Sequence, residues 1–220
     1  APQDQAAQDE QIEPDAALSP VFRSGINFIR VDAVVTDDDG RFVLPELPDA
    51  MYSVWVRGYG LVDSSPVSVR PGAEVALNAT PARTAQEAAR VYPAHYWYSL
   101  LEVPPRSEFP GTGDEGNGIS TNMRSQEQWL DMTKQGCQLC HQLGNQVTRE
   151  ITHLSHLGFD SHQEAWEHRV QVGVRGGLMN TFMGRFGHGK GIDMYADWTA
   201  RIAGGETPDA PPRPTGDAQN

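Results

Sequence analysis

The chain has 220 residues, and its charged side chains sum to a formal net charge of −12 at pH 7. Such an acidic chain lacks the basic surface that binding to nucleic acid requires. The sequence contains no run of eighteen apolar residues, so no transmembrane helix is predicted. Glycine (22) and proline (16) are frequent, which predicts modest cores and long loops in one or two domains. The chain opens at Ala1-Pro2 without methionine, so we expect a mature chain left after processing.

The first part of the chain changes character near residue 20. Residues 1–20 are dominated by Gln, Asp, Glu, Ala and Pro without apolar periodicity, which predicts a disordered or partner-wrapped arm. Residues 21–82 contain short runs rich in β-branched and aromatic residues, at 26–36, 41–44 and 51–57, with turn signals between them. Short strands at this spacing predict a small β-sandwich.

A resemblance to a known family lies in this segment. The run DDGRFVLPELP at residues 38–48, followed by YSVWVRGY at residues 52–59, resembles the carboxypeptidase regulatory-like domain. That resemblance implies a transthyretin-like sandwich that serves as a structural or interaction module and carries no catalytic machinery. The family's usual first strand is hard to place here, so we expect a sandwich that lacks one strand or borrows it. Such a sandwich could accept a strand from a neighbouring chain.

Residues 83–120 are predicted to link the sandwich to the rest of the chain. An Ala-rich helix is expected over 81–92, with Thr84 as its N-cap and a glutamate three positions later completing a capping box. The aromatic stretch 92–101 follows. We interpret it as a hydrophobic strap between two domains, or as a flap that covers a site or docks a partner. The remaining Gly- and Pro-rich residues predict a loop.

The two cysteines of the chain lie together in the run CQLCH at residues 137–141. This Cys-x-x-Cys-His pattern is typical of covalent c-type haem attachment. On a helical turn, Cys137 and Cys140 lie on one face, and each sulfur can add across one vinyl group of a porphyrin. His141 then supplies the proximal iron ligand. The motif therefore predicts one covalent haem c, and attachment of this kind implies a bacterial periplasmic or secreted protein.

Two other interpretations of the cysteine pair stay open. A redox disulfide would need a preceding strand and a βαβ context, whereas residues 126–135 are helix-like. A zinc site needs four ligands, and His153 and His156 could supply the second pair.

The motif belongs to a segment, residues 121–206, with helical patterning. Helices are expected at about residues 125–135, 148–154, 161–174 and 192–203. The order of these parts resembles that of a small class I cytochrome c: a helix, the attachment motif, a distal loop, and a last helix that carries aromatic residues. That resemblance implies an all-α domain that transfers single electrons.

The sixth iron ligand is then expected in the loop before the last helix, because that family usually takes a methionine sulfur from there. Met179, with Phe182 three positions later, fits best, and Met183 is the runner-up. His188, between two glycines, is a further candidate, as are the other histidines of the region, while Met194 is expected in the core. Methionine ligation raises the potential and histidine ligation lowers it. A vacant site would suggest small-ligand or peroxide chemistry.

The whole sequence predicts an α+β multidomain protein. An immunoglobulin- or transthyretin-like β-sandwich precedes an all-α cytochrome c-like domain, and residues 207–220 form a Pro-rich extended tail. The predicted function is one-electron transfer through a single haem, with a redox protein partner or as a subunit of a larger assembly. Two alternatives are a haem enzyme or sensor with an open sixth site, and an assembly module whose sandwich carries the partner surface.

Overall fold

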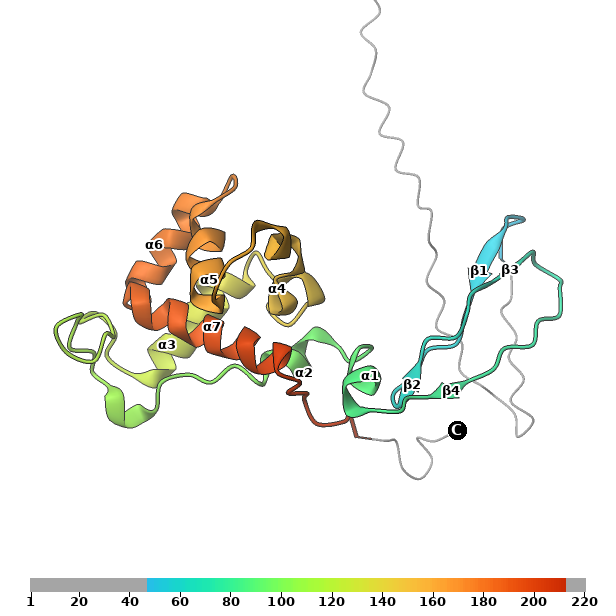
Figure 1. Ribbon diagram of the computed structural model, residues 1–220, viewed down its shortest axis with the longest axis horizontal. Helices are drawn as coiled ribbons and strands as arrows, with labels where there is room; N and C mark the ends of the chain where they lie inside the picture. The colour runs from blue at the N-terminus through green and yellow to red at the C-terminus, as the bar shows by residue number, and fades with distance from the viewer. Residues whose placement is uncertain (1–46, 213–220) are drawn as a thin grey trace, which may run out of the picture. The chain divides into compact units, whose positions relative to one another are not determined.

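The structure is a computed structural model that describes residues 47–212, apart from the side chains of residues 152 and 153 (Figure 1). From Pro48 onward these residues belong to one compact unit. The arm predicted at residues 1–20 and the first predicted strands lie outside the described residues, as does most of the predicted C-terminal tail. Among the described helices, none is long and apolar enough to cross a membrane.

Four short strands form two separate antiparallel ribbons in the described part of the chain: β1 (Tyr52–Val54) pairs with β3 (Val67–Val69), and β2 (Leu61–Val62) pairs with β4 (Thr80–Pro81). In β1, Tyr52 and Val54 are half-buried, whereas Ser53 between them is exposed. Such alternation is expected of a strand with one face turned inward, because successive side chains of a strand face opposite sides. Two ribbons do not make a sandwich, so the sandwich over residues 21–82 stays a prediction.

Seven α-helices follow in the described residues: α1 (Ala85–Ala89), α2 (Ala94–Tyr98), α3 (Gln126–Met132), α4 (Gln146–Glu150), α5 (His162–Gln171), α6 (Gly176–Phe186) and α7 (His188–Ala203). They are joined by two 3₁₀ helices, η1 (Arg106–Glu108) and η3 (Thr152–Leu157), and by one π-helix, η2 (Thr133–Gln138). The helices α5, α6 and α7 pack against one another, and α3 and α4 contact this group (Figure 1). The helical part expected over residues 121–206 is therefore present.

Polar side chains begin four of these helices. Thr84 accepts a hydrogen bond from the Glu87 N–H at 3.2 Å, which confirms the predicted N-cap of α1. The Glu87 carboxylate in turn accepts from the backbone N–H of Arg83 at 2.7 Å, one residue earlier than a standard capping box. Ser125 and Ser161 cap α3 and α5 in the same way, and Asn145 caps α4.

The core of the helical part is built around large aromatic side chains. Trp129 of α3 is fully buried, and its indole N–H donates to the sulfur of Met194 on α7 at 3.2 Å. Met194 is therefore a core residue, as predicted. Trp198 is equally buried and donates to the backbone carbonyl of Trp97 at 3.0 Å. These bonds satisfy indole donors that burial would otherwise leave without a partner.

The aromatic stretch 92–101 forms the short helix α2, which lies between two groups of residues. Trp97 is buried and donates to the carbonyl of Ala89 in α1, while its own carbonyl accepts from Trp198. The Tyr92 ring meets the Tyr59 ring edge-on at 5.6 Å. The stretch thus contacts the ribbon region and the helical core, which agrees with its interpretation as a hydrophobic strap.

The sequence prediction for the segment before the last helix is wrong. The segment before the last helix, which carries Met179, was expected to be a loop, and it forms the eleven-residue helix α6 (Gly176–Phe186). Its apolar residues recur four positions apart, at Leu178, Phe182 and Phe186, which is the spacing of a helical face. The two glycines at its start suggest a turn, but they begin the helix instead.

Candidate functional site

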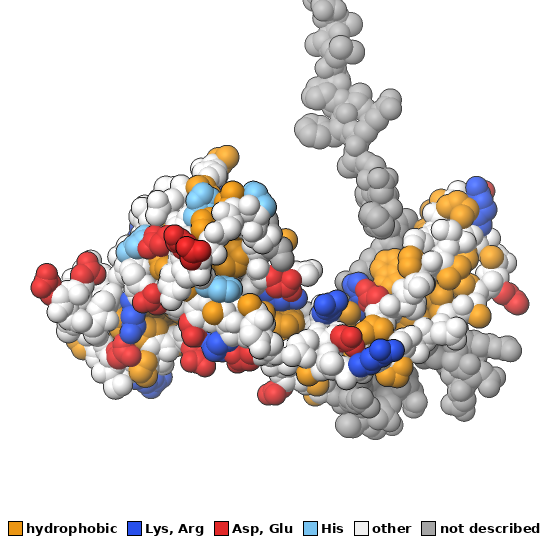
Figure 2. Space-filling model, viewed as in Figure 1, with side chains coloured by type: hydrophobic (Ala, Val, Ile, Leu, Met, Phe, Trp, Pro, Cys, Tyr) orange, Lys and Arg blue, Asp and Glu red, His pale blue; other side chains and the backbone are white. Residues whose placement is uncertain are grey.

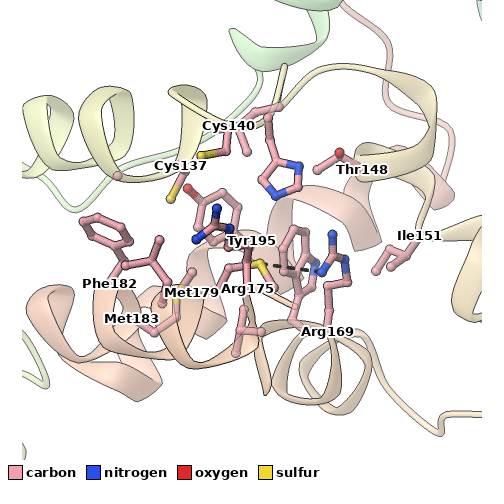
Figure 3. A pocket seen from close by; sticks show the side chains of 16 residues that line it. Cys137, Cys140, Thr148, Ile151, Arg169, Arg175, Met179, Phe182, Met183 and Tyr195 are labelled. Atoms are coloured by element: carbon pink, nitrogen blue, oxygen red, sulfur yellow. Dashed lines mark hydrogen bonds between the residues drawn. The ribbon is translucent and has the colours of Figure 1, made fainter. Parts of the chain in front are cut away.

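A pocket between η2, α5, α6 and α7 brings the cysteine motif and the methionines of α6 together (Figure 3). Including the part open to solvent, it encloses about 760 Å³. Most of the side chains that line it are apolar. The lining residues are Gly136, Cys137, Cys140, His141, Leu143, Thr148, Ile151, Trp166, Arg169, Val170, Arg175, Leu178, Met179, Phe182, Met183 and Tyr195.

The cysteine motif is positioned by a change in helix type. After α3 the chain continues as the π-helix η2, which ends just beyond Cys137. The N–H groups of Cys140 and His141 both donate to the Cys137 carbonyl, at 3.2 and 3.0 Å, so one tight turn holds all three residues. Single-turn π-helices occur often at functional sites, because they re-aim side chains without ending the helix.

Gly136 allows this turn to approach α6. A Cβ atom at Gly136 would lie 2.8 Å from the Phe182 ring, closer than side chains tolerate. Only a residue without a side chain therefore fits between the π-helix and Phe182. The close approach sets the width of the pocket between the cysteine motif and α6.

The acid–base properties of the motif follow from its burial. Burial raises the pKa of the Cys137 thiol, an effect that the Tyr195 hydroxyl opposes and the nearby Cys140 reinforces. Burial lowers the pKa of His141, and the positive charge of Arg169 lowers it further. The His141 imidazole is therefore neutral at pH 7, which is the form that binds metal ions.

The two candidate methionine ligands differ in where their sulfur lies. Met179 is half-buried, and its sulfur is 3.6 Å from Nη1 of Arg169. Met183 is buried, and its sulfur lies 3.1 Å from where a Cβ of Gly191 would be, so it packs against α7. Figure 3 shows both methionines on the opposite wall of the pocket from Cys137 and Cys140.

The candidate His188 does not line this pocket. It is the first residue of α7, and its Nε2 lies 2.8 Å from a carboxylate oxygen of Glu167. The flanking Gly187, with φ of 97°, makes the turn into α7 rather than a mobile loop. One ring nitrogen of His162 is likewise engaged in a hydrogen bond, because its Nδ1 lies 2.8 Å from the Thr199 hydroxyl.

Three ionisable residues of the pocket escaped the sequence analysis. Tyr195 is 1% exposed, and its hydroxyl has no hydrogen bond of good geometry among the described residues. Its oxygen lies beside Cys137 in Figure 3, and burial raises its pKa well above 10. Arg169 and Arg175 are the other two. Their one sequence signal is two cations six positions apart in an acidic chain.

Ile151 gives the pocket a strained wall. It ends α4 with φ of 48°, which β-branched residues rarely adopt, and its side chain is buried in the pocket lining. The helix predicted at residues 148–154 is broken at this point into α4 and η3. Strain of this kind is often kept where it places a side chain in a functional site.

The zinc alternative stays untested, because the side chain of its candidate ligand His153 lies outside the described residues. Within them, no three His, Cys, Asp or Glu side chains gather closely enough to hold a metal ion together. Comparisons with known proteins add no further candidate: no protein family, no curated protein and no solved structure matches this chain. The kind of site must therefore be inferred from its own side chains, which are thiols, an imidazole and thioethers around an apolar pocket.

Proposed function

We propose that this chain is a periplasmic or secreted mono-haem c-type cytochrome that transfers single electrons, as a subunit or partner of a larger redox assembly. One observation carries the proposal. Cys137, Cys140 and His141 line the same apolar pocket as Met179, which lies on its opposite wall. The sequence motif alone predicts the attachment, and the pocket adds a second wall with a soft sulfur ligand.

The residues present fit a covalently held haem. Cys137 and Cys140 are both free, and they stand at the spacing that tethers a porphyrin edge. His141 is neutral and faces the same space. The aromatic rings of Trp166 and Phe182 give the apolar surface that a flat macrocycle requires.

A haem held here would supply a one-electron couple between Fe(III) and Fe(II). The chain's own residues would set how easily that couple is reduced. His141 and Met179 would present a nitrogen and a thioether sulfur, a pair that raises the potential. The buried Trp166 would exclude water from one side of the pocket, which also disfavours the more highly charged iron.

The exposure of the motif favours electron transfer between proteins over an enclosed reaction. Cys140 is exposed, and Leu139 beside it is 80% exposed. The tethered edge of a haem would therefore lie at the protein surface, within reach of a docked partner. An exposed leucine of this kind is surface that a partner could cover.

The ribbon region offers a separate surface for assembly. Figure 2 shows hydrophobic side chains gathered over the ribbons, where Met51, Trp55, Tyr59 and Val67 are all exposed. Exposed apolar surface of this extent often marks an interaction site. It supports the role of this part of the chain as the module that joins the cytochrome to its assembly, including by exchange of a strand.

A second candidate function is a haem enzyme or sensor with an open sixth site. One observation favours it: the Met179 sulfur already accepts a contact from Arg169, at 3.6 Å. A sulfur engaged by a cation is a weaker iron ligand, which a small external ligand could replace. Rapid binding of carbon monoxide by the reduced protein would support this candidate, and a stable six-coordinate spectrum would support the electron carrier.

The proposal is tested on protein produced in cells that attach haem c. The intact mass after denaturation should exceed that of the polypeptide by one haem, and a pyridine haemochrome spectrum should show thioether-linked haem. The variant Cys137→Ser/Cys140→Ser should lose this mass, while His168→Gln, which keeps the motif, should retain it. Colourless wild-type protein with two reactive thiols would sink the proposal.

A further inference from the structure

Two arginines line the apolar pocket without a carboxylate partner. Arg169 of α5 is half-buried, and the one polar contact of its side chain within the described residues is the sulfur of Met179. Arg175 is exposed at the start of α6 and has no ion pair or hydrogen bond from its side chain within the same residues. Figure 3 shows both side chains among those that surround the pocket.

Four other arginines in the described residues also have no ion pair, Arg83, Arg90, Arg124 and Arg185, but none of them lines the apolar pocket. Several of the remaining arginines pair with carboxylates at 2.6 to 3.4 Å. Examples are the pairs Arg70–Asp49, Arg106–Glu127, Arg149–Glu150, Arg201–Asp197 and Arg201–Glu206. A guanidinium group beside apolar walls gains more from an anion than one in water does, because the local dielectric is lower.

The acidic residues on the same helix do not supply that anion. Glu167 of α5 pairs with His188, and Glu164 accepts a hydrogen bond from the backbone N–H of Asp160. The N-terminus of α6, which begins next to Arg175, adds positive partial charge at the same place. Two arginines and the start of α6 thus bring positive potential to the pocket, and no Asp or Glu is among the residues that line it.

We propose that Arg169 and Arg175 form a carboxylate-binding subsite in the wall of the pocket. The inference rests on the proposed function, and it assigns an orientation to the ligand: apolar body between the aromatic walls, acidic groups toward the two guanidinium groups. Because Arg169 is half-buried and Arg175 is exposed, the subsite runs from the pocket to its solvent mouth. A planar guanidinium group binds a carboxylate through two parallel hydrogen bonds, so two arginines match two carboxylates.

The carboxylates could come from two sources. A haem c keeps its two propionate side chains after the vinyl groups have reacted, so the pocket's own cofactor carries a matching pair. A free small carboxylate could occupy the same guanidinium groups as a separate ligand. The flat apolar walls favour propionates, because they require an apolar body attached to the acidic groups.

The test uses the full chain produced without haem attachment, titrated with protoporphyrin IX and with its dimethyl ester. Binding is followed by quenching of tryptophan fluorescence, since Trp166 lines the pocket. The free acid should bind at least about tenfold more tightly than the ester, the effect of one or two charge-assisted hydrogen bonds. In Arg169→Gln/Arg175→Gln, the preference should fall to about threefold or less.

The matched control is Arg185→Gln, which removes the same charge from α6. Its guanidinium lies over the Phe182 ring, 5.0 Å from the ring centroid, and it is not among the residues that line the pocket. The control should keep the tenfold preference for the free acid. Equal binding of acid and ester by the wild-type chain refutes propionate binding, and that comparison needs no variant to fold.

A succinate arm separates the two sources of carboxylate. Succinate that binds the wild-type chain but not the double variant would keep the subsite and make the free anion its ligand. No preference for the free acid together with no succinate binding would overturn the subsite altogether. The mass of haem-loaded protein reports on the proposed function independently, so the failure of one idea is distinguishable from the failure of the other.

Discussion

Nη1 of Arg169 lies 3.6 Å from the sulfur of Met179, so a cation from α5 and a thioether from α6 meet inside the pocket. Met183, one helical turn further along α6, instead packs its sulfur against Gly191 of α7. The two methionines thus differ in what their sulfurs face, although both line the pocket. Met179 can therefore turn its sulfur toward a ligand in the pocket, whereas Met183 would first have to give up its packing against α7.

The first prediction separates these two methionines in haem-loaded protein. Met179→Leu should lose the weak absorption band near the red edge of the visible spectrum that reports methionine–iron bonding. Met183→Leu should keep that band, and it should cost less than about 1.5 kcal/mol of stability because leucine has nearly the same volume. Loss of the band in Met183→Leu alone would reverse the assignment. Its absence from the wild-type spectrum would favour histidine ligation or an open site.

The second prediction concerns the narrow contact between Gly136 and Phe182. Gly136→Ala should destabilise the chain, because overpacking costs about 1–3 kcal/mol whereas replacing a helical glycine by alanine gains at most about 1 kcal/mol. In a Phe182→Leu background the same substitution should become neutral or stabilising, since the ring it would meet is gone. Urea unfolding of the four chains measures this coupling as a double-mutant cycle. Equal costs of Gly136→Ala in both backgrounds would show that the contact does not limit the approach of η2 to α6.

A third prediction follows from the buried hydroxyl of Thr199. It lies 2.8 Å from His162 Nδ1 and accepts from the indole N–H of Trp166 at 3.1 Å, which ties α5 to α7. Thr199→Val keeps the shape but removes the oxygen, so it should cost about 1–3 kcal/mol for each buried group left unpaired. Thr199→Ser retains the oxygen and should cost less than about 1 kcal/mol. Similar unfolding midpoints for the two variants would argue against this role of the hydroxyl.

The parts of the fold that could be predicted from the sequence are those with local signals. Thr84 marks the start of α1 because its hydroxyl caps the helix, whatever the helix packs against. The final helix was expected from Ile192, but it starts at His188, because Gly187 turns the chain directly into it. The helix α6 was missed since paired glycines have a low intrinsic helix propensity, which packing on α5 and α7 overrides.

The residues of the candidate site also fall into those that local sequence signals predict and those that they do not. Cys137 and His141 could be predicted to lie together from their spacing, since residues four positions apart on a helical turn share a face. Tyr195 and Arg169 could not, because they reach the pocket from separate helices and only tertiary packing brings them there. The π-helix η2 was not predicted either, because the composition of residues 133–138 does not distinguish a π-helical turn from an α-helical one.

The last prediction concerns stability against pH. Burial lowers the pKa of His162 in the folded chain below its ordinary value of about 6.5, so the unfolded chain binds a proton more readily. The contribution of neutral His162 is therefore fully present above pH 6.5 and is lost as the pH falls through its folded pKa. The lowered pKa values of Asp63 and Glu127 act in the same direction, but only below about pH 4.

We expect the urea midpoint of the haem-free chain to fall between pH 7.5 and pH 5.5, and His162→Asn to reduce that fall. Asparagine can still bond to the Thr199 hydroxyl but does not titrate in this range. His141 titrates in both chains, so the difference between them isolates His162. The control His156→Asn removes an exposed histidine and should leave the fall unchanged. An equal fall in the wild-type and His162→Asn chains would show that burial of His162 does not couple folding to protonation, and that the hydrogen bond to Thr199 acts alone.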